Sequence, residues 1–192
     1  MMNKNFTVLA FLIVLNIISF SIDFKGIDFT SEEGSLYIDV AIDDIFSKDA
    51  LDSLENGQEI KIYLLVNTYE KKTLLPNKKI SSAEERNLIQ YNIITQKYHV
   101  VIGKKPSNRD ESFEEDKEES FDMIGKFKKL LILKESDLDR NKDYKITVEI
   151  KVVSLKMSPP ISFIFDLFFD LNYSETRSFE FSGAQLLETY FK

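Results

Sequence analysis

Acid–base or nucleophilic chemistry in this sequence would depend mainly on carboxylates, because histidine occurs once and cysteine does not occur. Histidine is the usual base that activates a serine or cysteine nucleophile. His99 stands between Tyr98 and Val100 in a run of aromatic and β-branched residues, and the sequence has no serine motif of the G-x-S-x-G type. We therefore interpret His99 as an ordinary strand residue and predict no catalytic triad.

A second arrangement that could bind a ligand is an alternating run of acidic and amide residues. The run consists of Asp137, Asp139, Asn141 and Asp143. This spacing is typical of the start of a calcium loop, and calcium prefers several oxygen ligands. However, Lys142 takes the place of the turn glycine, and Val148 takes the place of the closing glutamate. We therefore predict an Asx-rich turn that leads into a strand, without calcium.

Composition limits the remaining chemistry. Without cysteine there is no disulfide, no thiolate zinc site, no iron–sulfur cluster and no acylated lipoprotein cysteine. The six glycines are scattered and form no phosphate-binding loop. With 32 acidic residues, a pair of carboxylates means little until the fold is known. We predict that the protein is not an enzyme and uses no cofactor or metal.

The most unusual local feature is Ser158-Pro159-Pro160 followed by an apolar run up to Leu171. Serine caps helices and proline is favoured in the first helical turn, so we predict a helix here. Its surface would be apolar except for one acidic stripe, so the helix is buried, lies at a membrane interface or receives a partner. Burial in the protein's own core is the default interpretation. The alternative is a partner or ligand surface made of Pro159, Pro160, Ile161, Phe165 and Phe168.

The elements that would position these residues follow a hydrophobic leader. Lys4 precedes an apolar run over residues 6–20. The small residues Ser19 and Ser21 have the spacing that a signal peptidase recognises, with cleavage after Ser21. We predict that residues 1–21 are a signal peptide or, if uncleaved, an N-terminal membrane anchor. Residues 22–192 would then form a single domain in the bacterial cell envelope, either periplasmic or anchored to the outward face of the cytoplasmic membrane.

Alternating apolar and polar residues indicate half-buried strands in the rest of the chain. The strands are predicted over residues 36–42, 60–69, 88–102, 144–152 and 178–181. Pro76-Asn77 predicts a turn after the second strand, and the long third strand leaves room for a bulge near Thr95-Gln96.

Helices are predicted to be short and fewer than the strands. Ser47 would cap the first helix and Asn56-Gly57 would end it. Residues 104–119 are predicted to be an acidic, mobile loop. Ser120 would then cap a second helix with an apolar face made of Met123, Ile124, Phe127, Leu130 and Leu131. A last helical turn is predicted over residues 184–191.

The order of these elements predicts the fold class. Strands and helices do not alternate regularly, so a parallel sheet is not supported. We predict an α+β fold, with an antiparallel β-sheet or sandwich-like domain and two or three short helices, preceded by the hydrophobic leader helix.

The charge of the chain limits its partners. The formal net charge is −7, and no basic stripe interleaved with aromatic residues is present. An acidic body repels polyphosphate, so we predict no nucleic-acid partner. By the same reasoning it gains nothing from an anionic membrane surface, so membrane contact is predicted only through an uncleaved leader.

Several loosely spaced motifs follow the leader. A Tyr-x-x-apolar-x-x-x-Tyr stretch is matched by Tyr91, Ile94 and Tyr98, a Tyr-initiated strand starts at Tyr144, and an apolar-Pro-x-Pro-apolar motif is approximated at Ser158-Pro159-Pro160-Ile161. In these features the chain resembles an uncharacterised bacterial family of exported proteins, domain of unknown function 4390. The resemblance implies tryptophans toward the C-terminus, where this chain has residues such as Phe168 and Phe179. The resemblance covers most of the mature chain and implies an envelope location. It implies no activity and no site residues.

These observations leave several functions open. We expect an exported envelope protein that is a non-catalytic interaction or assembly module, with an unidentified envelope protein as its partner. The first alternative is a periplasmic binding protein for an apolar ligand or lipid. The second is an envelope hydrolase that uses carboxylates brought together by the fold.

Overall fold

The computed structural model describes residues 22–103, 110–154 and 173–191. The leader therefore lies outside the described residues. The same is true of the candidate surface made of Pro159, Pro160, Ile161, Phe165 and Phe168. Among the helices of the described part, none has the length and apolar character needed to cross a bilayer.

A three-stranded antiparallel sheet contains the first two strands and a later one. Its strands, in spatial order, are β1 (Asp23–Glu32), β2 (Ser35–Asp43) and β7 (Lys126–Lys134). The predicted alternation in β2 is confirmed, with Leu36, Ile38, Val40 and Ile42 all buried. A tight turn joins β1 to β2, with positive φ at Glu33 and Gly34, as hairpins of this kind require.

The larger antiparallel sheet has six strands. In spatial order they are β6 (Asp110–Glu114), β5 (Lys97–Ile102), β4 (Lys78–Asn92), β3 (Glu59–Glu70), β8 (Asp143–Ser154) and β9 (Tyr173–Ser182). Strands β3 and β8 confirm the strands predicted over 60–69 and 144–152, and each buries alternate residues on one face. That face contacts the three-stranded sheet, so both sheets share one hydrophobic core.

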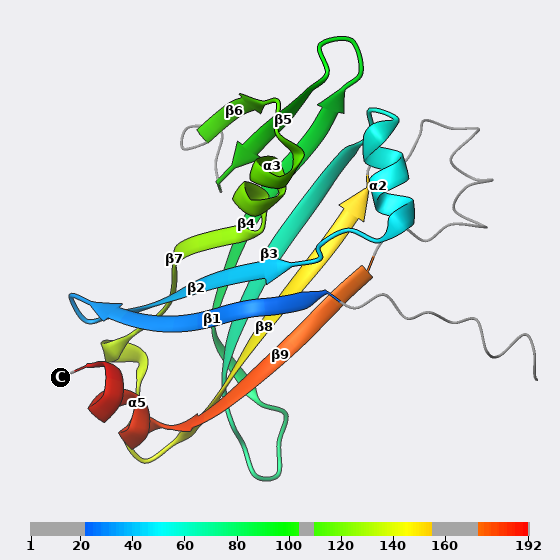
Figure 1. Ribbon diagram of the computed structural model, residues 1–192. Coiled ribbons are helices and arrows are strands. Elements are labelled where there is room, and N and C mark those ends of the chain that lie inside the picture. The colour runs from blue at the N-terminus through cyan, green and yellow to red at the C-terminus, as the bar shows by residue number, and fades with distance from the viewer. Residues whose placement is uncertain (1–21, 104–109, 155–172, 192) are drawn as a thin grey trace, which may run out of the picture.

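Three α-helices and one 3-10 helix complete the described part. They are α2 (Lys48–Glu55), α3 (Lys117–Ile124), η2 (Glu135–Asp137) and α5 (Gly183–Tyr190). Helices α2 and α3 lie toward one end of the large sheet and α5 lies toward the other (Figure 1). Ser47 caps α2 as predicted, and its hydroxyl accepts from the backbone N–H of Ala50 at 3.2 Å. The α+β class with antiparallel sheets is confirmed.

The prediction of a helix that begins at Ser120 and continues through Leu131 is wrong. The cap of helix α3 is Asp116, four residues before Ser120, and the helix ends before Gly125. The Ser120 side chain is buried and donates to the Asp116 carbonyl at 2.6 Å. The apolar residues that follow form β7, which is an extended strand with two register shifts against β2.

The single strand predicted over 88–102 is also wrong, because it is a hairpin made of β4 and β5. Asn92 stops the first strand, since its side-chain oxygen accepts from the backbone N–H groups of Ile94 at 3.0 Å and Thr95 at 3.1 Å. Tyr91 and Tyr98 are therefore register partners on neighbouring strands, with ring centroids 4.9 Å apart.

Of the acidic loop predicted over 104–119, residues 104–109 lie outside the described residues, and the described remainder is not a loop throughout. Its later residues form β6, which pairs with β5, and the first turn of α3. Strand β1 and the first half of β4 were not predicted. The turn after η2 agrees with the prediction of an Asx turn, since the Asp139 carboxylate accepts from the Asn141 backbone N–H at 3.0 Å.

Polar bridges link β4 of the large sheet to β7, an edge strand of the small sheet, and to the end of α3. The fully buried amide of Asn87 on β4 donates to the carbonyls of Ile124 at 2.9 Å and Lys126 at 3.4 Å. Ser81, also on β4, donates its hydroxyl hydrogen to the Ile132 carbonyl of β7. Buried polar groups of this kind are retained when their partners are present, so these bonds hold α3 and β7 against the large sheet.

Candidate functional site

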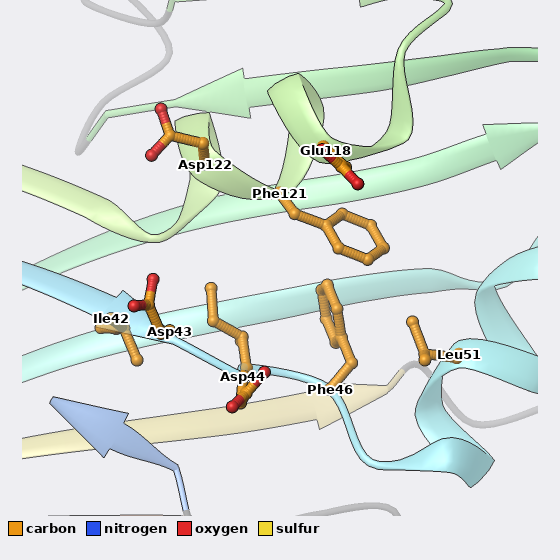
Figure 2. A pocket seen from close by; sticks show the side chains of 9 residues that line it. Ile42, Asp43, Asp44, Phe46, Leu51, Glu118, Phe121 and Asp122 are labelled. Atoms are coloured by element: carbon orange, nitrogen blue, oxygen red, sulfur yellow. The ribbon is translucent and has the colours of Figure 1, made fainter. Parts of the chain in front are cut away.

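A pocket of about 500 Å³ opens where β2 ends, between helices α2 and α3 (Figure 2). Three segments form it: the end of β2 with the linker that follows, the first turn of α2, and the middle of α3. The first two segments form one continuous run over residues 42–51, whereas α3 comes much later in the sequence, and the packing of the two sheets brings them together. The volume lies within the range of about 300–1,000 Å³ that is typical of ligand sites.

The floor of the pocket is apolar and partly aromatic. Its side chains are Ile42, Ile45, Phe46, Leu51 and Phe121. Phe46 from the linker and Phe121 from α3 face each other with ring centroids 4.8 Å apart at 64°, an edge-to-face arrangement. Figure 2 shows these two rings meeting across the gap, with Leu51 beside Phe46. Such a floor can receive an apolar side chain or ring.

The rim of the pocket is acidic. Asp43 and Asp44 lie on the β2 side, and Glu118 and Asp122 lie on the α3 side (Figure 2). Asp43 has Lys25 as its ion-pair partner, and Asp122 has Lys126. Asp44 and Glu118 are exposed and have no ion-pair partner among the described residues. Two carboxylates therefore remain free to attract a cation at the mouth of an apolar pocket.

The wall formed by the linker is held by Tyr173, the first residue of β9. The Tyr173 hydroxyl donates to the Ile45 carbonyl and accepts from the Ser47 backbone N–H at 3.3 Å. Burial raises the pKa of Tyr173 well above its usual range, so the hydroxyl remains a donor. The linker includes Asp44 at φ +48°, a conformation that non-glycine residues seldom adopt. Tyr173 thus fixes a strained segment that carries part of the rim.

The wall formed by α3 is held by close backbone contact. The Ile42 backbone N–H donates to the Gly125 carbonyl at 3.0 Å. A Cβ on Gly125 would lie 2.8 Å from the Ile42 carbonyl oxygen and 2.9 Å from Cδ1 of Ile45. Only glycine therefore allows α3 to end this close to β2.

An ion pair joins the two helices on either side of the pocket. The Lys117 ammonium lies 2.9 Å from a Glu55 carboxylate oxygen and 5.6 Å from the centroid of the Phe121 ring. The hydrogen bond from Lys117 to Glu55 raises the pKa of Lys117, so this side chain stays charged at neutral pH. Because Glu55 already binds it, Lys117 does not neutralise the free carboxylates of the rim.

The structure places His99 away from the pocket, on the outer face of the large sheet. It stacks on Phe113 of β6 with ring centroids 4.7 Å apart, and its Nε2 lies 3.6 Å from an oxygen of Glu111. In the described part of the chain, no group of three or more acidic, histidine or cysteine residues has the arrangement of a metal site.

Sequence reasoning missed the pocket residues, although two signals were present. Phe46 and Leu51 stand just before the Ser47 cap and at the fourth helical position, the spacing of a hydrophobic staple. Asp116 and Glu119 have the spacing of a capping box, and the Asp116 carboxylate accepts from the Glu119 backbone N–H at 2.8 Å. The second signal marks the observed start of the helix that carries Phe121 and covers the pocket.

Comparison with known proteins gives one match. Neither a curated protein nor a solved structure matches the chain. Residues 20–177 match the model of a family described as a domain of unknown function, DUF4390. The match includes all three segments that form the pocket. The chain therefore belongs to the DUF4390 family.

Proposed function

We propose that the protein is a non-catalytic interaction module that binds an apolar, positively charged segment of a partner protein. The observation that carries the proposal is the pocket itself, in which the aromatic floor of Phe46 and Phe121 lies beneath an acidic rim. An apolar side chain that fills such a floor loses contact with water and supplies most of the binding energy.

The rim adds selectivity for charge. A lysine or arginine next to the inserted side chain would lie near Asp44 or Glu118, neither of which is neutralised by a described residue. Charges at the rim of an interface favour the correct partner and speed its association more than they raise affinity. We therefore expect binding to weaken as the salt concentration rises.

We also propose that this binding takes place outside the cytoplasmic membrane. The apolar run over residues 6–20 supports export, as does the spacing of Ser19 and Ser21 before the candidate cleavage site. The partner would then be another protein of the cell envelope.

A second candidate function is the binding of an uncharged apolar ligand. The pocket volume of about 500 Å³ supports it, since that volume suits a small molecule as well as a side chain. The acidic rim argues against fatty acids and anionic lipids, because their headgroups would lie near Asp44 and Glu118.

Selection of random peptides displayed on phage, with the full chain immobilised, tests the proposal. We expect the selected peptides to combine lysine or arginine with a neighbouring aromatic or aliphatic residue. The double variant Asp44→Asn, Glu118→Gln should bind the selected peptides about tenfold more weakly, because each exposed ion pair contributes up to about 1 kcal/mol. Asparagine tolerates the positive φ at position 44, so the backbone is preserved.

The matched control is the double variant Glu84→Gln, Glu149→Gln. It removes the same two charges from the outer face of the large sheet, where both residues are register partners of Leu65. This variant should bind the peptides like the unmodified protein. Selected peptides without an excess of basic residues, or equal losses in both double variants, would contradict the proposal.

A further inference from the structure

The loop between β3 and β4 combines exposed leucines with lysines. Residues 71–79 read Lys-Lys-Thr-Leu-Leu-Pro-Asn-Lys-Lys, with four lysines and no acidic residue. Leu74 is 93% exposed and Leu75 is 71% exposed, and all other residues of the stretch are exposed as well. Figure 1 shows this loop projecting at the lower end of the large sheet. A net-negative protein thus has a basic, apolar tip.

The base of the loop is well ordered by pairing and hydrogen bonds. Glu70 pairs with Lys78, the last register pair of β3 and β4. The Lys71 backbone N–H donates to the Asp143 carbonyl at 2.8 Å, and the Lys72 backbone N–H donates to the Asn77 side chain at 3.2 Å. Pro76, next to the leucines, has no N–H group. Fewer backbone donors therefore need water, which lowers the cost of placing the tip in an apolar medium.

The four lysines differ in their partners. Lys71 binds Glu180 at 2.8 Å, and Lys72 binds the buried carboxylate of Glu70. Lys78 and Lys79 have no ion-pair partner among the described residues. Two positive charges are therefore free beside the exposed leucines.

We propose that this loop docks on an anionic lipid bilayer, with Leu74 and Leu75 inserted at the interface and Lys78 and Lys79 at the level of the headgroups. The chemistry on both sides is complementary, because aliphatic side chains enter the acyl region while lysines attract anionic headgroups. An acidic protein pocket could also receive one leucine beside a lysine, but Leu74 and Leu75 are exposed together on this loop, and the continuous apolar layer of a bilayer accepts both.

The β4–β5 turn shows that exposed apolar residues alone do not make such a site. Ile94 at that turn is 94% exposed, as fully as Leu74. Its neighbours are uncharged except for Lys97, which is paired with Glu115 at 2.9 Å. The turn therefore offers a matched control, with equal exposure but no free positive charge.

A fluorescent probe on the loop tests the proposal directly, because the chain has no cysteine of its own. The full chain with Leu74→Cys, labelled with an environment-sensitive fluorophore, is reconstituted with vesicles of phosphatidylglycerol and phosphatidylcholine or of phosphatidylcholine alone. The N-terminal apolar segment is present in both samples. In anionic vesicles we expect the emission to shift to the blue and acrylamide quenching to fall, whereas in neutral vesicles neither should change.

Removing the two free lysines should release the loop. In Lys78→Gln, Lys79→Gln, the ratio of inserted to withdrawn loop should fall about 25-fold, since each lysine near an anionic surface contributes roughly a factor of five. The same fluorophore attached at Ile94→Cys should show the emission and the acrylamide quenching of a water-exposed probe in every sample. The proposal is overturned by any of three results: a Leu74 probe that stays in water, one that responds equally in neutral vesicles, or one that is unaffected by loss of the lysines.

Discussion

Replacing Asn87 with aspartate should lower the free energy of unfolding by about 4 kcal/mol at neutral pH. The Asn87 amide group donates to the Ile124 carbonyl at 2.9 Å and to the Lys126 carbonyl at 3.4 Å, and the residue is fully buried. A carboxylate of the same size would place negative charge against two carbonyl oxygens and would leave both without their donor. The change should also loosen α3, because these carbonyls lie at its end.

Denaturant unfolding at two pH values measures this effect. A carboxyl group in this position has a raised pKa in the folded state, because burial disfavours its charged form. The loss of unfolding free energy is therefore complete above that raised pKa. It shrinks as the pH falls toward about 3.9, the pKa of an unfolded aspartate, below which the group is neutral in both states. The control is Asn67→Asp on the outer face of the same sheet, where we expect a loss of less than about 1 kcal/mol. Equal losses for the two variants would mean that Asn87 does not bridge the sheets.

Replacing Gly125 with alanine should cost about 2–3 kcal/mol of stability and should also disturb the pocket. The added methyl carbon would lie 2.8 Å from the Ile42 carbonyl oxygen, which cannot move without breaking the strand. Helix α3 must therefore shift away from the linker, and the Phe46–Phe121 contact at 4.8 Å should open.

The control for this change is Gly26→Ala in β1. A Cβ there would meet only an Asp28 carboxylate oxygen at 3.9 Å, so the stability should change by less than about 0.5 kcal/mol. Thermal melting gives the stability of both variants, and aromatic nuclear Overhauser contacts give the distance between the rings. If Gly125→Ala melts like Gly26→Ala, the close approach of α3 to β2 is wrong.

The strands with strict alternation could be predicted from sequence, but β7 could not, because bulges change its period. Ile38 pairs with Leu130, and Val40 pairs with Phe127, so one residue of β2 between these pairs lies opposite two of β7. Lys129 in this bulge has φ +53°. The three-residue spacing between buried side chains is the same as on a helix face, and this explains the wrong prediction of a helix.

The β4–β5 hairpin was hidden by the composition of its turn. Ile93, Ile94 and Thr95 favour strands, and the turn depends instead on the Asn92 side chain and on Gln96 at φ +56°. Local propensity therefore pointed away from the observed structure.

The candidate site could not be predicted because its residues meet only after folding. Phe46 and Phe121 are 75 positions apart, and their contact depends on the packing of α3 across the end of β2. Net charge does not describe the individual surfaces, for a similar reason. The value of −7 averages an acidic pocket rim with the basic loop over 71–79 and describes neither surface.

The central claim is that the pocket receives a basic, apolar segment of an envelope partner, and a photo-cross-linker at the pocket tests it most directly. We place p-benzoylphenylalanine at Leu51 in the full chain, expressed in its native cells, with a second sample carrying it at Leu65 on the outer face. Irradiation should give a cross-linked adduct at position 51 but not at 65. The adduct should weaken with Asp44→Asn, Glu118→Gln and persist with Glu84→Gln, Glu149→Gln. A cross-linked segment with lysine or arginine beside an apolar residue is the predicted result, whereas no adduct at 51, or one with a segment lacking basic residues, would contradict the claim.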